Sequence, residues 1–487
     1  MISIRTPLAT ATFFLLAATT PAQDAPPEQH SVPRPRTLKL TDYIAEGLAE
    51  TLLTATLEVP ENREQPDGRK ISLHIVIVPA LTKGAKDAPL FDIAGGPGLA
   101  ATSNADWYAA DSTGYRATRD IVLVDQRGTG LSNPLRCPEL EAARKLDTMY
   151  DLDAVRRCRA ELEKNADLTQ YGTLAAVRDL DDVRKALGYE KIDLMGLSYG
   201  TTVAQAYMRE YPQNVRCAVL MGTVPIDEKL PLHHARGGEE VLQKLFDDCD
   251  RDPTCGNKFP SLRSEWNDLM NEFEAGPVKA IYSDSVDTRL VTLERGPFCE
   301  AFRTLLLTTS LQRRIPFIVH RAASGDFQPF FDAVGPDSSS SPFAEGMYLC
   351  VTCPEGTQRI TSDEIASETA GTFLGRYRVD RQIAACNEWP TVALADESMQ
   401  PVTASIPTLL LAGAMDYVAP VSWAQEVSSR LSDSRVVVID YLGHLPEGVV
   451  NMECFDELIL QFLRAGTTVG LDVSCVETML PPSFESE

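Results

Sequence analysis

Short apolar segments recur along the chain, and each ends in a glycine-rich or acidic loop. Most of these loops are followed by segments with the hydrophobic spacing of an amphipathic helix. Buried strands that alternate with helices predict a mostly parallel sheet covered by helices on both faces. Functional groups are then expected at the carboxyl ends of the strands. The segments are ISLHIVIVPA (71–80), APLFDIAGGPG (88–98), DIVLVDQRGTG (120–130), KIDLMGLSYG (191–200), RCAVLMGTV (216–224), IPTLLLAGAMD (406–416) and SRVVVIDYLGH (434–444).

A long stretch between the fifth and sixth of these segments lacks the alternation of strand and glycine loop. Residues 224–401 contain amphipathic segments of helical period, such as GGEEVLQKLFDDC and LRSEWNDLMNEFEAG. We expect this stretch, called the cap below, to be a mainly helical insertion over the ends of the strands. It divides the predicted core into residues 37–223 and 402–487.

The first 36 residues do not belong to the predicted fold. A single arginine, Arg5, precedes the apolar run PLATATFFLLAATT, which is too short to span a membrane and is followed by small residues. We therefore predict a signal peptide over residues 1–22, a flexible leader over residues 23–36, and export to the periplasm or the cell exterior. No later segment reaches the roughly 18 apolar residues that a membrane helix needs.

The chain is acidic, with a formal net charge of −24. A protein of this charge repels phosphate backbones and anionic lipids, so nucleic-acid and membrane-surface partners are not expected. The charge does not predict the oligomeric state.

The eleven cysteines fit an oxidising compartment and fall into pairs. Cys217, in an apolar run, is expected to be a free buried thiol, and Cys299 and Cys350 are left over as a fifth candidate pair. A metal site is the alternative for CVTC (350–353), but no second such pair and no histidine lie nearby. The four expected disulfides are Cys137–Cys158, Cys249–Cys255, Cys353–Cys386 and Cys454–Cys475.

The segment KIDLMGLSYG contains a serine, Ser198, in the pattern Gly-x-Ser-x-Gly. An apolar strand precedes Ser198, and a helical segment that ends before Pro212 follows it. A serine at such a strand-to-helix turn has a strained backbone and an exposed hydroxyl, and the flanking glycines leave room for the strand and helix to meet. The context favours a catalytic nucleophile over an ordinary turn.

A serine nucleophile needs a histidine base and a carboxylate that orients the histidine. Of the six histidines, His444 alone follows a late predicted strand; the others lie in the leader, inside a strand or helix, or at the start of the cap. In this architecture the order along the chain is serine, acid, histidine. Asp416 ends the preceding strand and is the favoured acid, with Asp440 as the competitor.

Two backbone N–H groups are expected to stabilise the oxyanion that forms during attack. The residue after the nucleophile, Tyr199, lies at the start of a helix and supplies one. The glycine loop Gly95–Gly98 ends an early strand, and Gly96 is the predicted second donor. The lysine and the Ser/Thr of a phosphate-binding loop are absent from this segment.

Together, GGPG, DQRGTGLS, GLSYG, LAGAMDYVAP and GH resemble the α/β-hydrolase peptidases of the proline iminopeptidase and tripeptidyl aminopeptidase type. The resemblance implies the α/β-hydrolase fold, a triad of Ser198, Asp416 and His444, and cleavage next to a free peptide N-terminus. Residues 405–475 resemble the C-terminal segment of secreted tripeptidyl aminopeptidases. Ala94 stands where proline iminopeptidases have a histidine. We interpret DQRGTG as a structural turn beside the site.

An aminopeptidase must also bind the ammonium group of its substrate, which requires a carboxylate in the cap. Glu355 and Glu388 are the candidates, because both lie beside cysteines that are expected to form disulfides. In secreted relatives an aspartate follows the glutamate at the first position, whereas this chain has Gly356. The alternative for both glutamates is a solvated surface position.

The sequence therefore predicts an exported serine hydrolase that needs neither a metal nor another cofactor and acts on short peptides with a free N-terminus. A carboxylesterase or lipase would use the same triad without an ammonium-binding carboxylate. A non-catalytic binding protein on the same fold is a remote alternative, since no triad residue is missing. The number of residues released per cut is not predicted.

Overall fold

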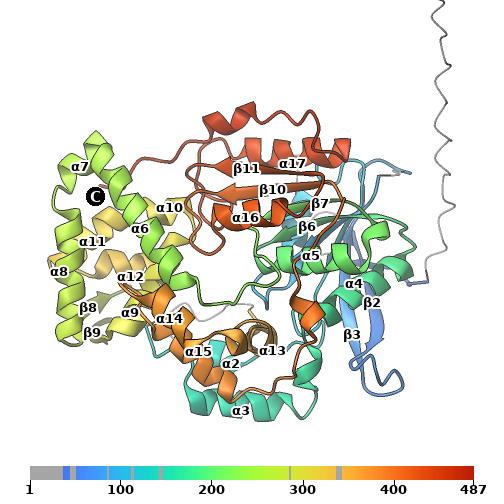
Figure 1. Cartoon of the computed structure of the whole chain (residues 1–487), viewed down its shortest axis with the longest axis horizontal. Coiled ribbons are helices and arrows are strands. Elements are labelled where there is room, and N and C mark those ends of the chain that lie inside the picture. The colour runs from blue at the N-terminus through green and yellow to red at the C-terminus, as the bar shows by residue number, and fades with distance from the viewer. Residues whose placement is uncertain are drawn as a thin grey trace, which may run out of the picture. The chain divides into compact units, whose positions relative to one another are not determined.

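The strands of the main sheet are β1 (Thr41–Tyr43), β2 (Leu52–Pro60), β3 (Lys70–Val78), β4 (Leu90–Ile93), β5 (Ile121–Val124), β6 (Ile192–Leu197), β7 (Val215–Met221), β10 (Thr408–Gly413) and β11 (Ser434–Ile439). They belong to a computed structural model that describes residues 37–43, 51–84, 87–110, 114–141, 146–284, 287–335 and 343–486. Among these residues the strand order is β1-β2-β3-β5-β4-β6-β7-β10-β11. The pairs from β1 to β5 are antiparallel, and all pairs from β5 to β11 are parallel. The predicted mostly parallel sheet is confirmed (Figure 1).

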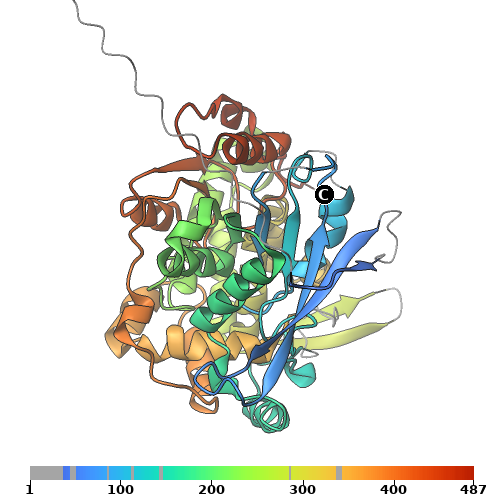
Figure 2. The same ribbon diagram turned by 90° about the vertical axis from the view of Figure 1, so that its right-hand side faces the viewer.

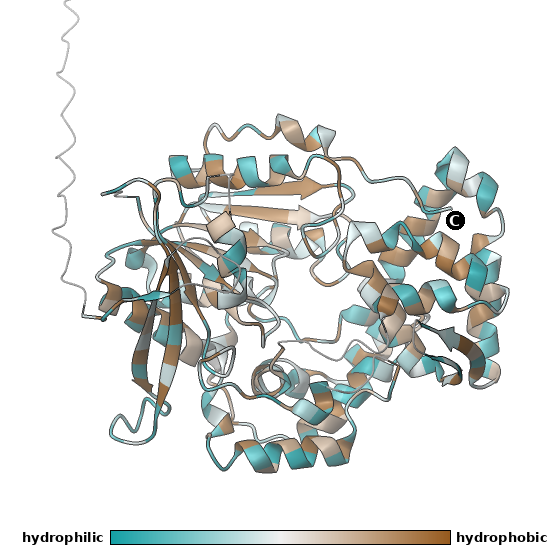
Figure 3. Ribbon diagram, turned by 180° about the vertical axis from the view of Figure 1, so that it is seen from behind, coloured by the Kyte–Doolittle hydropathy of each residue, from teal (hydrophilic) through white to brown (hydrophobic). Residues whose placement is uncertain are grey.

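Helices cover both faces of this sheet. Successive residues of a strand point to opposite faces, so neighbouring residues of one strand pack against different helices. In β7, Ala218 and Leu220 pack in a core that also contains residues of α4, α5 and α16. Cys217 and Val219, which alternate with them, pack in a core that contains residues of α1 and α17. These helices are α1 (Ala105–Ala110), α4 (Thr173–Leu187), α5 (Tyr199–Glu210), α16 (Val421–Ser428) and α17 (Glu453–Ala465). Hydrophobic strands between helices of mixed polarity are visible in Figure 3.

The strands β2 and β3 are nine residues each and lie toward the antiparallel side of the sheet. Figure 2 shows them in blue. A loop between β5 and α4 carries two further helices, α2 (Pro138–Glu141) and α3 (Leu152–Leu162). This loop contacts the cap, as described below.

The cap is mainly helical, as predicted, and its first part has a core of its own. Residues of α6 to α9, α11 and α12 form this core, which also takes in Met415 and Tyr417 from the loop after β10. The cap helices are α6 (His234–Arg251), α7 (Pro253–Lys258), α8 (Leu262–Ala275), α9 (Arg295–Arg303), α10 (Thr309–Gln312), α11 (Ile315–Ala323), α12 (Gln328–Val334), α13 (Glu345–Glu355), α14 (Ser362–Thr369) and α15 (Tyr377–Asn387).

Two features of the cap differ from a simple helical insertion. A two-stranded hairpin, β8 (Val278–Ser283) with β9 (Thr288–Leu293), interrupts the helices. Its first strand buries every second residue against the cap core, which is the period of a strand rather than of a helix. In addition, α13 packs into the core of the main sheet, where Met347 and Leu349 are fully buried.

All four expected disulfides are present: Cys137–Cys158, Cys249–Cys255, Cys353–Cys386 and Cys454–Cys475. Cys217 is a free buried thiol, as predicted. The candidate fifth pair, Cys299 with Cys350, is wrong. Cys299 is buried in the core of the cap, whereas Cys350 lies in the core of the main sheet and accepts a hydrogen bond from the Trp389 indole at 3.3 Å.

The predicted signal peptide and leader, residues 1–22 and 23–36, lie outside the described residues. Within the described part of the chain, no helix has both the length and the apolar character needed to cross a membrane.

Candidate active site

Ser198 lies at a sharp turn between β6 and α5. Its φ of 57° and ψ of −127° are unusual for a residue with a side chain, and α5 begins at the next residue. A Cβ atom on Gly200 would lie 2.1 Å from the carbonyl oxygen of Ile93, and one on Gly196 would lie 2.5 Å from the carbonyl oxygen of Gly200. The two glycines are therefore required for the close approach of strand and helix, as the sequence pattern indicated.

The structure brings Ser198, His444 and Asp416 into one hydrogen-bonded chain. The Nε2 atom of His444 is 2.9 Å from the Ser198 hydroxyl oxygen, and its Nδ1 atom is 2.8 Å from Oδ2 of Asp416. The other carboxylate oxygen of Asp416 accepts hydrogen bonds from the backbone amides of Val418 and Ala419 at 2.8 and 2.9 Å. The carboxylate is thus fixed in place and buried, with Nδ1 as the ring nitrogen that carries the proton.

The competing acid, Asp440, does not join this chain. It follows β11 and is exposed, whereas the Asp416 side chain is 1% exposed and contacts the imidazole. The loop that follows β10 therefore supplies the carboxylate that contacts His444.

The predicted oxyanion donors lie on the helix that follows Ser198 and on the loop after β4, the strand that pairs with β6. Tyr199 is the first residue of α5, so its amide has no acceptor within the helix. Gly95 approaches Ser198 closely, because a Cβ on Gly95 would lie 3.2 Å from the Cβ of Ser198. Gly96 follows with a φ of +111°, and among the described residues no acceptor pairs with its amide. Among the described residues, the amides of Tyr199 and Gly96 thus have no hydrogen-bond acceptor, and the glycine loop passes close to Ser198.

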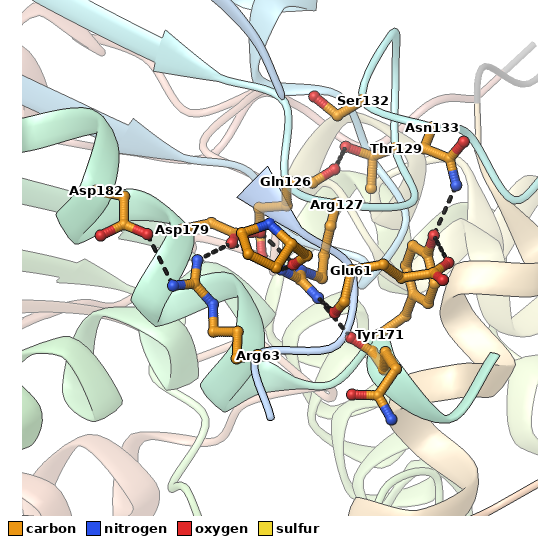
Figure 4. A network of polar contacts seen from close by, with 12 residues as sticks. Glu61, Arg63, Gln126, Arg127, Thr129, Ser132, Asn133, Tyr171, Asp179 and Asp182 are labelled. Carbon is orange, nitrogen blue, oxygen red and sulfur yellow. Dashed lines mark hydrogen bonds and ion pairs between the residues drawn. The ribbon is translucent and has the colours of Figure 1, made fainter. Parts of the chain in front are cut away.

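The loop after β5, residues 125–130, contacts the strand end before the glycine loop and is itself fixed by polar contacts; Figure 4 shows those of Arg127. Gln126 donates a hydrogen bond to the carbonyl oxygen of Ala94, directly before the glycine loop, at 3.1 Å. Arg127 is fully buried and forms a bidentate ion pair with Asp179 of α4, with both contacts at 2.7 Å. It also donates to the carbonyl oxygen of Glu61 at 2.8 Å. These paired buried charges agree with the structural role that we expect for DQRGTG.

A cap segment between α9 and α11 binds the loop that carries His444. The Thr309 hydroxyl donates to the carbonyl oxygen of Tyr441 at 2.7 Å and accepts from the amide of Gly443 at 3.2 Å. The carbonyl oxygen of Leu307 accepts from the amide of Leu445 at 3.0 Å. The backbone on both sides of His444 is therefore fixed by the cap.

The same cap segment also binds the loop that carries Asp416. The side-chain amide of Gln312 donates to the carbonyl oxygen of Met415 at 3.0 Å and is fully buried. Tyr417, which follows Asp416, is buried in the cap core, and its hydroxyl contacts the Arg303 guanidinium. These contacts could not be predicted from sequence patterns, because they join segments more than 100 residues apart.

Glu355, the first predicted ammonium-binding residue, lies beside α5, the helix that follows Ser198. Its carboxylate accepts hydrogen bonds from the amide and hydroxyl of Thr173, at 2.7 and 2.5 Å, and so caps α4. The Thr173 hydroxyl is in turn 2.8 Å from the Tyr199 hydroxyl. Burial raises the pKa of Glu355 above its usual range. A cavity of about 30 Å³ lies between this carboxylate and Tyr199.

A second carboxylate, Glu228, lines the same cavity and was not predicted. It follows β7 in the segment PIDEKLP and makes no ion pair with any described residue. Removal from water, with Asp227 and Glu368 nearby, raises its pKa to about 7. The two carboxylates thus face a space that holds about one water molecule or one ammonium group.

Glu388, the other predicted ammonium-binding residue, has a different partner. Its carboxylate pairs with Arg156 at 2.8 Å on the protein surface, and this pair lowers its pKa. It does not line the cavity beside Tyr199. Among the described residues, no cluster of three or more histidine, cysteine or acidic side chains has a geometry that suits a metal ion.

Two family models match the chain. The α/β hydrolase fold model matches residues 93–248, which include the turn at Ser198. The model described as TAP-like protein matches residues 371–475, which include Asp416 and His444.

Three curated relatives show how far the similarity extends. Serine protease Hip1 of Mycobacterium tuberculosis is 26% identical over 466 residues, 87% of each chain. The tripeptidyl aminopeptidase of Streptomyces coelicolor is 24% identical over 474 residues, 89% of this chain and 85% of the relative. Carboxylesterase B of Mycobacterium tuberculosis is 32% identical over 231 residues, 42% of this chain and 43% of the relative.

Proposed function

Because the chain is an α/β-hydrolase with a TAP-like C-terminal segment, distantly related to a serine protease and to tripeptidyl aminopeptidases, we propose that it is an exported serine peptidase. Its substrates are short peptides with a free N-terminus. The observation that carries the proposal is the hydrogen-bonded chain Ser198–His444–Asp416 beside unpaired backbone amides.

The proposed reaction begins when the Ser198 hydroxyl attacks the peptide carbonyl and His444 Nε2 accepts the proton. Asp416 holds the Nδ1–H group and stabilises the imidazolium that forms. The amides of Tyr199 and Gly96 donate to the oxyanion, and loss of one such donor costs about 100- to 1000-fold in rate. His444 then gives the proton to the leaving amine, and water releases the acyl group from Ser198.

Recognition of the peptide N-terminus is assigned to Glu228 and Glu355. Both carboxylates face a cavity next to Tyr199 whose volume, about 30 Å³, fits an ammonium group. Glu355 is already oriented by Thr173, and Glu228 has no competing cation in contact. A bound ammonium would favour the ionised form of both residues.

Export is supported by the disulfides. Eight of the eleven cysteines form four bridges, which persist in an oxidising compartment.

The test compares hydrolysis of two chromogenic tripeptide anilides that differ only in an acetyl group on the N-terminus. We expect the free peptide to be cleaved at least about 10-fold faster, because a charge-assisted hydrogen bond is lost on acetylation. Ser198→Ala should abolish both reactions. Equal cleavage of the two peptides, or cleavage by the Ser198→Ala variant, would contradict the proposal.

A second candidate is a carboxylesterase with the same triad, and the partial match to Carboxylesterase B favours it. Ester and amide substrates with the same acyl group separate the two candidates. An enzyme that hydrolyses the ester and leaves the matching anilide intact at equal enzyme concentration is a carboxylesterase.

A further inference from the structure

A second cavity, of about 720 Å³, lies between the cap and the loop that carries α2 and α3. This volume is in the range of sites that bind small ligands or several side chains. Phe343 lines the cavity, and its ring also packs on the glycine loop, with Cε2 3.1 Å from the position of a Cβ on Gly96. The cavity therefore begins one aromatic ring away from the predicted oxyanion donor.

One wall of the cavity is a strained segment that the cap holds in place. Tyr150 has a φ of 53°, which is uncommon for an aromatic residue. The Tyr377 hydroxyl accepts a hydrogen bond from the amide of Met149 at 2.8 Å, and Arg381 donates to the carbonyl oxygens of Met149 and Tyr150. These contacts from α15 fix the Tyr150 ring in the wall of the cavity.

The cavity is lined by a carboxylate, Glu345, that no cation neutralises by direct contact. Glu345, the first residue of α13, is half-buried and receives a hydrogen bond from the Tyr150 hydroxyl at 3.3 Å. Among the described residues it forms no ion pair, whereas the nearby Arg378 is bound to Glu300 and to the Tyr348 hydroxyl. The carboxylate is therefore available to a ligand.

The cavity lining is partly charged and partly apolar. The charged residues besides Glu345 are Glu139, Asp147, Asp151, Arg157, Glu300 and Arg378, and the two arginines are paired with Glu139 and Glu300. Leu140, Met149, Ala301 and Phe343 line the cavity together with the carboxylate. An aliphatic stem that ends in a cationic group suits such a wall, because the stem is removed from water while the charge reaches the carboxylate.

The helix α13 links this cavity to the small cavity beside Tyr199. Glu345 begins the helix and lines the larger cavity, and Glu355 ends it and lines the smaller one. Eleven helical residues span roughly 15 Å. An extended peptide covers this distance with about four residues.

We propose that the larger cavity is a substrate subsite for a basic side chain, lysine or arginine, located a few residues from the peptide N-terminus. Glu345 binds the cationic group, the Tyr150 hydroxyl orients Glu345, and Met149 and Phe343 contact the aliphatic stem. This proposal rests on the proposed peptidase function and adds a sequence preference to it.

The test uses hexa-alanine and ten variants of it, with lysine or its uncharged analogue norleucine at each of positions one to five. Cleavage is followed by mass spectrometry. We expect the lysine peptide to be cleaved at least about 10-fold faster than the norleucine peptide at one position, with kcat/KM as the measure. A ratio near one at all five positions in the wild-type enzyme overturns the proposal without any variant.

Two glutamate variants test the assignment to Glu345. Glu345→Gln should bring the lysine-to-norleucine ratio of kcat/KM within about 2-fold. The matched control is Glu388→Gln on the surface, which should keep the wild-type ratio. A ratio that survives Glu345→Gln contradicts the assignment.

The outcome for the subsite is separable from the outcome for the proposed function. If Ser198→Ala is inactive and free peptides are preferred, but lysine gives no advantage, only the subsite is wrong. If no peptide is cleaved at all, both the subsite and the proposed peptidase function are wrong.

Discussion

Individual atoms at the turn around Ser198 leave no space for side chains on its two glycines. The carbonyl oxygen of Ile93 occupies the position beside Gly200, and the backbone of Gly200 occupies the position beside Gly196. Backbone atoms cannot move away as a flexible side chain can. The Gly-x-Ser-x-Gly pattern is thus a packing requirement that accompanies the strained conformation of Ser198.

We predict that Gly200→Ala lowers the free energy of unfolding by about 3 kcal/mol, because its Cβ would lie 2.1 Å from a backbone oxygen. Gly371→Ala is the matched control. Unlike Gly200, Gly371 has a positive φ, +68°, and its Cβ position has open space, so the backbone conformation alone should cost about 1 kcal/mol. Urea unfolding measures both values. Equal losses for the two variants would contradict the packing argument.

The titration of Glu345 predicts a pH dependence of the basic-residue preference. Removal from water, and to a smaller degree Glu141, raises its pKa to about 7, whereas Arg378 and the Tyr150 hydroxyl act in the opposite direction. Below this pH the carboxyl group is neutral and does not attract a cation. The preference for a lysine over a norleucine peptide should therefore increase between pH 6 and pH 8.

The ratio of the two kcat/KM values isolates this titration, because any other titrating group that acts equally on both peptides cancels. Lysine remains charged over the whole range. A ratio that is constant between pH 6 and pH 8, or that falls, would show that Glu345 does not bind the cation.

The three residues of the hydrogen-bonded chain could be predicted from the sequence, because each of them follows a predicted strand. Ser198, Asp416 and His444 could be chosen from order along the chain and from local pattern alone. Glu228 could not, because the charged segment around it resembles a solvated turn. The cavity that it lines is completed by cap residues such as Val351 and Gly356, which are more than 100 residues away in the sequence.

At the scale of elements, the cap segment of residues 304–312 connects the two loops that hold the proposed base and acid. Thr309 bonds to the backbone on the amino side of His444, and Gln312 bonds to the residue before Asp416. These bonds position backbone rather than reacting atoms. We therefore expect them to affect the rate of the chemical step more than substrate binding.

We predict that Thr309→Val lowers kcat about 10-fold with little change in KM, since the variant has the same shape but loses both hydrogen bonds to the histidine loop. Thr369→Val is the control, because the Thr369 hydroxyl is buried and bonds only within its own helix, to the carbonyl oxygen of Ile365. Steady-state kinetics on the tripeptide anilide measures both parameters. An unchanged kcat in Thr309→Val, or an equal decrease of kcat in both variants, would contradict the positioning role of Thr309.

Two features at this scale could not be predicted from the sequence. They are the hairpin β8–β9 and the contacts that residues 304–312 make with the loops of Asp416 and His444. The hairpin's alternating burial exists only because one of its faces packs on the cap core. Helical period in the flanking segments gave no indication of a strand pair. Predictions from periodicity succeeded where an element's pattern repeats over several turns, as in α6 and α8.

At the scale of the whole molecule, disulfides reinforce the cap where it packs on the main core. Cys353 lies in α13 and Cys386 in α15, and these helices also carry Glu345, Glu355 and Arg378. The bridge spans 33 positions, whereas Cys249–Cys255 spans six. Chain entropy therefore predicts a larger stabilisation from the first bridge than from the second.

We predict that replacement of Cys353 and Cys386 by alanine lowers the free energy of unfolding by about 4 kcal/mol, and replacement of Cys249 and Cys255 by about 2 kcal/mol. Only the first change should reduce discrimination between free and acetylated peptides, because it loosens the helix that carries Glu355. Denaturant unfolding and the anilide assay provide the two readouts. The reverse order of stabilities would contradict the entropic argument.

The sheet and four of the disulfides followed from the sequence because strands, glycine loops and closely spaced cysteines are local signals. The division of the cap was not predictable. Helices α6 to α9, α11 and α12 form their own core, whereas α13 packs on the main sheet, and helical period alone does not show which core a helix joins. The unpaired Cys299 and Cys350 reflect this division, since each is buried on a different side of it.

The central claim, that Ser198 is the nucleophile of this enzyme, is tested most directly by covalent labelling. The full-length mature protein is treated with a fluorophosphonate probe, digested, and analysed by mass spectrometry. We predict one adduct, on Ser198, which is lost in Ser198→Ala and strongly slowed in His444→Ala. The absence of an adduct, or modification of another serine, would contradict the account.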